Sequence, residues 1–347
     1  MARIAVVTSS PPLTEGGHLV IARSLVSALE AAGHRADLVQ TPQNRFGRQA
    51  TAYLANWFTD VGVTGDGAAT DQVISLRFPS YAVRHPVHVC WLNHRMREYY
   101  DLWERFSGTL SWRGRLKEGV RRRILHRVDR YLLTRNVTRL YAQSRNIQAR
   151  LRRFGGIDSQ VLYPPPPPRP YRCDAYGDYL FTVSRLTPLK RVDLLLQALA
   201  QPAARGVRLV VGGTGEDESR LRDLSRALGI EARVTLTGRL SDEALVDHLA
   251  RCRAVCFVPQ DEDYGFVTAE AFASRKAVVT CRDSGGPTEL VEDGAGGVVV
   301  DPSAVALAPA LARLSDDRAL AERMGAAAAA VAAEMTWPRA IGKLVIV

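Results

Sequence analysis

Apolar and polar positions change along the chain with two distinct periods. Short apolar runs predict strands at residues 4–7, 36–39, 72–75 and 87–91 in the first half, and at 179–183, 207–211, 234–236, 254–258, 277–280 and 298–300 in the second. Between these runs, apolar residues recur at helical spacing, as at Ala22, Leu25, Val26 and Leu29 and again at Val192, Leu195, Leu196 and Leu199. Strands that alternate with helices are typical of parallel, doubly wound sheets. The sequence therefore predicts an α/β protein.

A proline-rich stretch from Tyr163 to Pro170 divides this pattern in two. Consecutive prolines continue neither a helix nor a sheet, and they form a stiff extended connector. Because the strand and helix pattern restarts afterwards, we expect two Rossmann-like domains. An alanine-rich helix near the end breaks at Thr336, and the tail beyond it is expected to return to the N-terminal domain. The expected bounds are 1–165 and 166–332 for the two domains and 333–347 for the returning segment; residues 41–70 show no clear period.

Length and composition narrow the class of protein. At 347 residues and 46% hydrophobic content, the chain can bury a large core. The first predicted strand begins at Ile4, which leaves no room for a secretory signal, and no apolar run approaches the roughly 20 residues of a membrane span. We therefore expect a cytoplasmic protein.

The five cysteines include no CxxC pair, and three of them lie in apolar stretches, so we expect buried free thiols. A metal site at Cys252 and Cys256 with His248 is disfavoured, because further ligands are missing nearby.

Positive charge is concentrated in one segment. The net charge is +10, and residues 113–153 alone contain 14 Arg or Lys against two acids, Glu118 and Asp129. A solvated basic helix face, an anionic membrane surface and a polyanionic acceptor all fit this excess. Nucleic acid fits less well, because the segment has no aromatic ladder or binding motif, and we expect no nucleic-acid partner.

Two loops in the second half carry candidate ligand-binding residues. Arg185 and Lys190 follow the strand at 179–183, at the end where open α/β sheets bind ligands. A guanidinium offers a planar fork and an ammonium a compact charge, so the pair suits a diphosphate, although an ordinary surface pair is the alternative. A glycine-rich run from Gly212 to Glu216 follows the next strand. It permits close backbone approach, but a tight turn explains it as well.

The most informative segment runs from residue 262 to residue 270. Glu262 and Glu270 are eight residues apart, and a helix is predicted to begin near Gly265 or Phe266. The free N–H groups of a helix start bind phosphate, and carboxylates accept hydrogen bonds from sugar hydroxyls. A nucleotide sugar carries both groups. A solvated pair of glutamates near a helix start is the alternative.

Together these motifs resemble family 4 glycosyltransferases, a retaining family with the GT-B fold, over nearly the full length. The motif residues are Gly16 and Gly17 in a Thr14-Glu15-Gly16-Gly17 loop, Ser184 to Lys190, Gly213 to Glu216, Glu262 to Glu270, and Gly285 and Gly286 with Glu289. The resemblance implies two Rossmann-like, doubly wound domains that face each other across a cleft. The N-terminal domain would bind the acceptor and the C-terminal domain the nucleotide-sugar donor.

The resemblance also implies roles for single residues. Arg185 and Lys190 would bind the donor diphosphate. Glu262 would face the transferred sugar, and His94, after an N-terminal strand, would lie close to it. The implied donor-binding residues are Gly16, Gly17, Gly213, Gly215, Gly265, Phe266, Val267, Thr268 and Glu270, the last through the ribose hydroxyls. In the family, glycine often follows the first glutamate; here Asp263 and Tyr264 follow it, which leaves the donor sugar open.

The implied function is retaining transfer of a hexosyl group from a nucleoside-diphosphate sugar to a glycan, lipid-linked or small-molecule acceptor, without cofactor or metal. Negative charge grows on the departing diphosphate, so nearby cations would supply the main stabilisation. A non-catalytic nucleotide-sugar-binding module and a GT-B sugar-nucleotide epimerase are the alternatives. If the basic segment binds lipid, the protein would lie at the inner membrane face.

Overall fold

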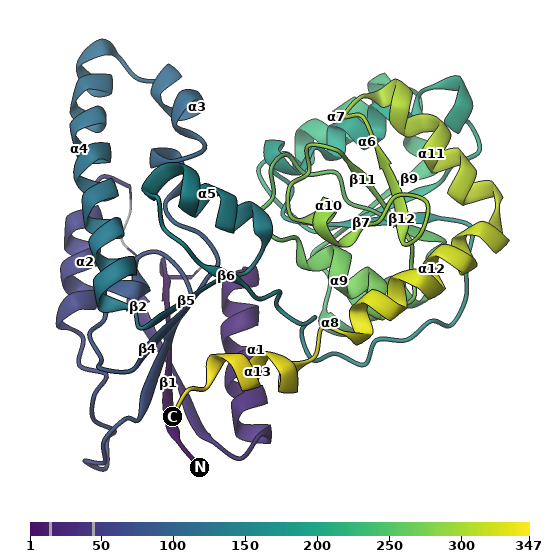
Figure 1. Ribbon diagram of the computed structural model, residues 1–347. Coiled ribbons are helices and arrows are strands. Elements are labelled where there is room, and N and C mark those ends of the chain that lie inside the picture. The colour runs from purple at the N-terminus through teal and green to yellow at the C-terminus, as the bar shows by residue number, and fades with distance from the viewer. Residues whose placement is uncertain (14–15, 44–45) are drawn as a thin grey trace. The chain divides into compact units, whose positions relative to one another are not determined.

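The computed structural model describes residues 1–13, 16–43 and 46–347, and the chain forms two compact units (Figure 1). Unit 1 consists of Met1–Pro164 and Trp337–Val347, and unit 2 of Pro165–Thr336. The chain passes from unit 1 to unit 2 inside the proline run, one residue before the boundary expected from the sequence. Thr14 and Glu15 of the predicted glycine loop lie outside the described residues.

Unit 1 is built on six parallel strands in the order β2-β1-β3-β4-β5-β6. The strands are β1 (Arg3–Ser10), β2 (Arg35–Pro42), β3 (Gln72–Ser75), β4 (His88–Leu92), β5 (Arg139–Ala142) and β6 (Gln160–Val161). The helices are α1 (Gly17–Ala31), α2 (Gln49–Phe58), α3 (Trp103–Gly108), α4 (Trp112–Tyr131), α5 (Arg145–Gly155) and α13 (Trp337–Leu344). Every residue of β3 and β4 is buried, as expected for central strands of a parallel sheet that helices cover on both faces.

The elements of unit 1 that periodicity did not predict include α2, β5 and β6. In α2 the polar side chains of Gln49 and Asn56 are buried together with Ala52 and Tyr53, and this mixture hides the apolar stripe. Thr41 Oγ1 satisfies Asn56 by donating to its Oδ1 over 2.5 Å. β5 begins with a charged residue inside the basic segment, for which a solvated helix face was one interpretation, and β6 has only two residues.

Unit 2 is built on a second sheet of six parallel strands, in the order β9-β8-β7-β10-β11-β12. The strands are β7 (Leu180–Val183), β8 (Leu209–Gly212), β9 (Val234–Gly238), β10 (Ala254–Cys256), β11 (Val278–Cys281) and β12 (Gly297–Val300). The helices are α6 (Val192–Leu199), α7 (Glu218–Ala227), α8 (Asp242–Arg251), α9 (Phe266–Ala273), α10 (Pro287–Leu290), α11 (Ala304–Asp316) and α12 (Arg318–Ala333). Every strand predicted in this half is present, with ends that differ by at most two residues. The apolar face of α6 packs into the main core cluster of the unit, which confirms its predicted period.

The C-terminal helix α13 belongs to unit 1 although it follows unit 2 in the chain. The Gln72 side chain of β3 holds it there, because Nε2 donates to the Leu344 carbonyl (2.6 Å) and Oε1 accepts from the Ile346 N–H (2.9 Å). The Trp337 ring also meets Trp91 of β4 edge to face, with ring centroids 6.3 Å apart. A buried amide and a pair of aromatic rings therefore fix the position of this helix in the unit.

Candidate functional site

The strand order in the sheet of unit 2 reverses between β7 and β10. These two strands are neighbours, with Leu180 paired to Ala254. From β7 the chain continues to β8 on one side, and from β10 to β11 on the other side. Open α/β sheets bind ligands at the carboxyl ends of the strands at such a switch point. The loops 184–191 and 257–265 leave from these two strand ends. Among the residues that the sequence suggested, these two loops contain Arg185, Lys190, Glu262 and Gly265.

The glycine-rich loop after β8 packs directly on the loop after β7. The Leu186 N–H donates to the Thr214 carbonyl over 3.0 Å. A Cβ atom on Gly213 would lie 1.9 Å from the Ser184 carbonyl oxygen, and one on Gly215 would lie 2.1 Å from the Leu186 carbonyl oxygen. No side chain fits in either gap. The contact between the two loops thus accounts for both glycines, and a role for them in donor binding stays a prediction.

Lys190 and Glu262 lie on facing loops and form an ion pair, with Nζ 2.5 Å from Oε2. Lys190 Nζ also lies above the ring of Phe257, 5.5 Å from its centroid. Each side chain of the pair keeps 21% of its surface exposed, so a ligand can reach both charges from solvent. The fold therefore brings together a cation and an acid that are 72 residues apart in the sequence.

Arg185 differs from Lys190 in that its side chain is exposed. It makes no hydrogen bond or ion pair with any residue of 1–13, 16–43 or 46–347, the ranges that the structure describes. The neighbouring Leu186 is only 1% exposed and anchors the loop in the core of the unit. Arg185 is thus an unpaired guanidinium on an anchored loop, which can bind an anion without breaking another interaction.

Arg191 connects three loops at the same edge of the sheet, a role that no motif of the sequence indicated. Its guanidinium donates to both carboxylate oxygens of Asp283, after β11, at 2.7 Å each. It also donates to the backbone carbonyls of Val258 (2.8 Å) and Pro259 (2.7 Å), after β10. Arg191 itself has a φ of 50°, in the left-handed region. These bonds fix the loops after β7, β10 and β11 relative to one another.

Helix α9 begins at Phe266, as the sequence predicts, and its amino end carries open hydrogen-bond donors. Gly265 before it has a φ of 84°, and a Cβ atom there would lie 2.7 Å from a ring carbon of Phe257. Within the described part of the chain, the N–H groups of Gly265, Phe266 and Val267 find no acceptor. Three such donors at a helix start form a suitable environment for a phosphate group.

Thr268 is less accessible than its neighbours. Its N–H donates to the Gly265 carbonyl (3.0 Å), and its side chain is fully buried. No residue that the structure describes forms a hydrogen bond with the Thr268 hydroxyl. A donor-binding role of this side chain, as the resemblance implies, would require it to become accessible.

Glu270 is buried in α9 and contacts Arg169 of the connector and Tyr171, which follows the connector; the sequence singled out neither residue. The Arg169 guanidinium donates to Glu270 Oε1, and the Tyr171 hydroxyl donates to the same oxygen at 3.1 Å. Arg169 also forms an ion pair with Asp242 (2.9 Å). Burial raises the pKa of the Glu270 carboxyl to about 7, and the nearby Arg169 charge opposes this shift.

The second carboxylate oxygen of Glu270, Oε2, has no hydrogen-bond partner among the residues that the structure describes. Arg169 and Tyr171 therefore position the carboxylate through one oxygen and leave the other for a ligand. The only hint in the sequence is that Arg169 lies between two prolines, where a long cationic side chain has a stiff backbone.

The candidates Gly16, Gly17 and His94 belong to unit 1. Gly16 precedes α1, and its carbonyl accepts the N–H of Leu19 (3.0 Å). His94 follows the carboxyl end of β4, and its Nδ1 lies 2.7 Å from the Arg95 carbonyl oxygen. All three residues lie beyond carboxyl ends of strands, β1 for the glycines and β4 for the histidine. Their predicted roles in donor binding and catalysis stay predictions.

The cysteines are free thiols, four of them buried and Cys173 partly exposed. Burial raises the pKa of Cys252 to about 12. Among the described residues, no group of three or more His, Cys, Asp or Glu side chains is arranged to hold a metal ion. None of the described helices has the length and apolar character needed to cross a membrane.

Comparison with known proteins assigns unit 2 to a family. Residues 174–331 match the family model of the group 1 glycosyl transferases. These residues are a group 1 glycosyltransferase domain. The domain includes the loop of Arg185 and Lys190 and both glutamates of the Glu262–Glu270 segment.

The group 1 glycosyltransferase domain also resembles curated proteins. The α-D-kanosaminyltransferase of Streptomyces kanamyceticus is 34% identical over 150 residues, which cover 42% of this chain and 39% of that protein. The D-inositol 3-phosphate glycosyltransferase of Corynebacterium diphtheriae is 34% identical over 171 residues, which cover 47% of this chain and 40% of that protein. The similarity thus spans about two fifths of each of these relatives.

Solved structures resemble the chain over nearly its full length. HepE of Anabaena, solved in complex with UDP and glucose, has a TM-score of 0.69 at 18% identity, with 99% of this chain and 98% of that chain covered. The sucrose-phosphate synthase of Thermosynechococcus elongatus has a TM-score of 0.75 at 16% identity, with 99% and 97% covered. At such identities the likeness shows the fold alone. The predicted GT-B fold of two Rossmann-like domains is confirmed.

Proposed function

We propose that the protein is a retaining glycosyltransferase that moves a hexosyl group from a nucleoside-diphosphate sugar to a glycan, lipid-linked or small-molecule acceptor. The observation that carries the proposal is the Lys190–Glu262 ion pair at the β7/β10 switch point. A ligand with both phosphate and hydroxyl groups can bind both members of this pair. The group 1 domain and the glycosyltransferase relatives support the same reaction class.

In this proposal unit 2 binds the donor and unit 1 the acceptor. Arg185 and Lys190 bind the diphosphate, together with the open N–H groups at the start of α9. Glu262 faces the transferred sugar, and Glu270 accepts hydrogen bonds from the ribose hydroxyls through its Oε2. His94 of unit 1 is the proposed contact with the sugar from the other unit.

The proposed mechanism relies on electrostatic stabilisation of the leaving group. Negative charge develops on the diphosphate while the anomeric bond breaks, and two cations and a helix start offset it without a bound metal. In a retaining reaction the acceptor attacks from the face that the diphosphate leaves, so the leaving phosphate can take the proton of the acceptor hydroxyl. HepE, which has the same fold, was solved with UDP and glucose, and this supports a nucleotide-sugar donor.

The proposed partners include an anionic membrane surface, reached through residues 113–153. This segment carries the largest local excess of positive charge in the chain. Basic side chains near an anionic leaflet are each worth about 1 kcal/mol. A cytoplasmic protein with this segment would bind peripherally at the inner membrane face, where lipid-linked acceptors are found.

The first experiment is a thermal-shift panel of nucleoside diphosphates and their sugars, followed by a turnover assay with the best donor. A ligand at 100 times its dissociation constant stabilises the protein by about 2.7 kcal/mol. Release of nucleoside diphosphate that depends on an acceptor supports transfer. Conversion of the donor sugar without any acceptor would instead indicate an epimerase. Tight binding without turnover across varied acceptors would indicate a binding module and contradict the proposal.

A further inference from the structure

The exposed face of α4 in unit 1 has an unusual composition. Its exposed side chains are either apolar or aromatic, namely Trp112 (72% exposed), Leu116 (65%), Val120 (48%), Ile124 (54%) and Tyr131 (58%), or cationic, namely Arg113, Arg115, Lys117, Arg123, Arg127 and Arg130. Across this helix, which the structure describes completely, no exposed side chain is acidic. The first four apolar residues, from Trp112 to Ile124, follow one another at intervals of four positions. They therefore lie along one side of the helix.

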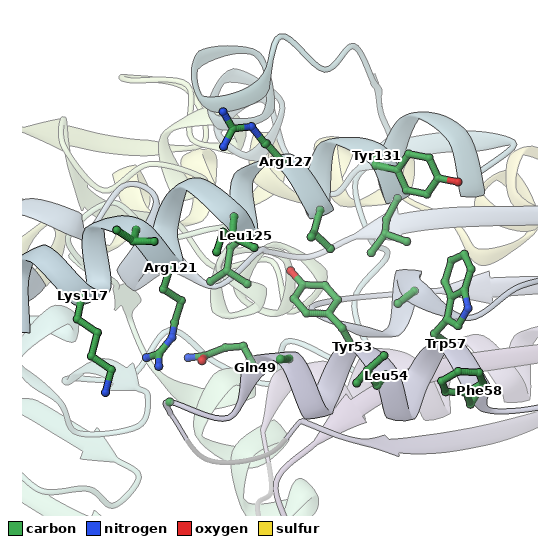
Figure 2. A pocket seen from close by; sticks show the side chains of 17 residues that line it. Gln49, Tyr53, Leu54, Trp57, Phe58, Lys117, Arg121, Leu125, Arg127 and Tyr131 are labelled. Atoms are coloured by element: carbon green, nitrogen blue, oxygen red, sulfur yellow. The ribbon is translucent and has the colours of Figure 1, made fainter.

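Helix α2 extends the apolar part of this face. Leu54 (55% exposed) and Phe58 (73%) lie on its outer side, and Trp57 lies beside them (Figure 2). Between α2 and α4 lies a groove of about 870 Å³, lined by side chains of both helices, with Lys117 and Arg127 among the residues along α4. α2 itself contains no charged residue. The two helices thus form one surface, apolar in its groove and basic along α4.

The orientation of α4 is fixed, so this face cannot turn inward. Both acids of the helix are buried on its opposite side. Asp129 accepts hydrogen bonds from the hydroxyls of Tyr53, Tyr81 (2.5 Å) and Tyr100 (2.5 Å). Glu118, in the first half of the helix, accepts a hydrogen bond from the Tyr99 hydroxyl (2.7 Å). The tyrosines hold the helix by its acids; Arg121 pairs with Glu118 on this side, and the exposed cations lie on the other side.

An ordinary solvated helix of the same protein looks different. α7 in unit 2 is also rich in arginine, but Arg220 is paired with Asp217 and Arg226 with Asp223. Its exposed positions carry no large apolar side chain, and all of its residues are described. A basic face that served only to keep the protein in solution would resemble α7. A continuous apolar surface with a charged border indicates a binding surface instead.

We propose that the α2–α4 surface docks on an anionic phospholipid bilayer, with α4 lying in the plane of the interface. This inference rests on the membrane partner proposed above, and it names the face and the mode of contact. The apolar residues enter the boundary between headgroups and acyl chains, and the arginines and Lys117 bind lipid phosphates. Trp112 and Tyr131, at the two ends of the helix, are of the types that settle at membrane interfaces.

Insertion distinguishes this mode from attraction by charge alone. A polyanionic glycan or a nucleic acid would use the arginines but would gain nothing from Leu116 or Ile124. A second copy of the chain would meet the same basic surface, and like charges would repel. An anionic bilayer offers negative charge and hydrocarbon at the same surface. Phospholipid is therefore the occupant that fits both parts of the face.

The test is co-sedimentation of the full chain with vesicles of phosphatidylcholine alone or mixed with phosphatidylglycerol. Wild-type protein is expected to bind the mixed vesicles and to bind pure phosphatidylcholine at least about tenfold more weakly. The double variant Leu116→Ser/Ile124→Ser should lose about tenfold or more in affinity for mixed vesicles at physiological ionic strength. Its matched control is Val305→Ser in unit 2, a substitution of an apolar side chain that is 73% exposed, which should bind as the wild type does.

A second pair of variants separates the α4 face from the rest of the basic segment. Arg123→Gln/Arg127→Gln removes two charges from the face, and Arg152→Gln/Arg153→Gln removes two exposed charges from α5. We expect a clear loss of binding in the first variant and little change in the second. Equal losses in both, or full binding by the Leu116→Ser/Ile124→Ser variant, would overturn the proposal.

Two further outcomes would also overturn it. One is a wild-type dimer in sedimentation velocity that the Leu116→Ser/Ile124→Ser variant abolishes, because the face would then bind a second copy. The other is binding to heparin or RNA that survives this variant while vesicle binding is absent. Nucleoside-diphosphate binding, measured on the same variants by thermal shift, reports on the proposed donor site and not on the α2–α4 surface. A failure of the proposed donor site therefore cannot be confused with a failure of the membrane surface.

Discussion

Each unit has a sheet of six parallel strands, but the two units place their charged residues in opposite ways. In unit 2, acids meet cations near the switch point, as in the Lys190–Glu262 and Arg169–Glu270 pairs. In unit 1, the two acids of α4 are buried and accept hydrogen bonds from tyrosine hydroxyls, and Glu118 also pairs with Arg121. The exposed cations of the same helix have no acidic partner among the described residues. Paired charges at defined positions suit one small ligand, whereas unpaired charges along a helix suit an extended surface. The same fold thus supports two kinds of recognition.

The strongest test of the donor site in this comparison is to remove its cations. Arg185→Ala and Lys190→Ala are each expected to reduce kcat/KM by about a thousandfold, because each removes a charge that offsets the leaving diphosphate. Acceptor-dependent release of nucleoside diphosphate measures the loss. Arg205→Ala, a change of an exposed arginine elsewhere in unit 2, serves as the control and should keep full activity. Full activity in both site variants would contradict the diphosphate role.

Asp129, one of the two buried acids of α4, is expected to matter for stability. Asp129→Ala leaves the hydroxyls of Tyr53, Tyr81 and Tyr100 without their acceptor, and burial beside Asp129 raises the pKa of these tyrosines, so they stay protonated donors. The expected loss in the free energy of unfolding is about 3 kcal/mol, measured by urea denaturation.

The control for that experiment is Asp158→Ala, because the Asp158 side chain is 92% exposed and its loss should cost less than about 0.5 kcal/mol. If the two variants lose similar amounts of stability, Asp129 does not fix α4.

The Arg169–Glu270 pair predicts a pH dependence of donor binding. With a pKa of about 7, Glu270 is largely protonated below neutral pH and ionised above it. A carboxylate is the better acceptor for ribose hydroxyls, so nucleoside-diphosphate affinity should rise as the pH passes upward through about 7. Removing the Arg169 charge raises the pKa of Glu270 further. Arg169→Met should therefore bind about tenfold more weakly at neutral pH, with the rise in affinity moved to higher pH.

Isothermal titration calorimetry across this pH range measures the shift. Arg172→Met is the matched control, because Arg172 lies three residues after Arg169 and pairs with Asp174 and Asp247 instead of Glu270. An unchanged pH profile in the Arg169→Met variant would show that the guanidinium does not influence the acid.

The smallest expected effect is that of Tyr171→Phe. It removes one hydrogen bond to Glu270 Oε1 and keeps the Arg169 contact. The net value of such a bond is about 1 kcal/mol, so affinity should fall by about fivefold, with a smaller upward shift of the pH profile than in Arg169→Met. Calorimetry at neutral pH suffices here. A larger loss of affinity than in Arg169→Met would show that Tyr171 positions the Glu270 carboxylate more strongly than Arg169 does.

Much of the fold could be predicted because its strands are apolar runs between helices. The strands of unit 2 and the first four of unit 1 were visible in this way, whereas β5 and β6 were not, since they are short and begin in or near a basic segment. The start of α9 at Phe266 was also predictable, because a glycine precedes an apolar helix there.

The partners of the site residues were harder to predict than the residues themselves. Arg169 and Glu270 are 101 residues apart, and their contact depends on how the connector packs, which no local pattern contains. For the same reason, the sequence did not show which side of α4 faces outward. The sequence showed its charge, but the hydrogen bonds of tyrosine hydroxyls to Asp129 and Glu118 decide which side faces outward.

The bonds of Arg191 have a consequence for the thermodynamics of ligand binding. One guanidinium clamps the segments after three strands, with Asp283 and the carbonyls of Val258 and Pro259 as its acceptors. Segments already held in this way lose little conformational freedom when a ligand arrives. The enthalpy of the polar contacts of a bound nucleotide should therefore contribute almost fully to the free energy of binding. The conformational entropy of these segments is already lost during folding and does not oppose binding.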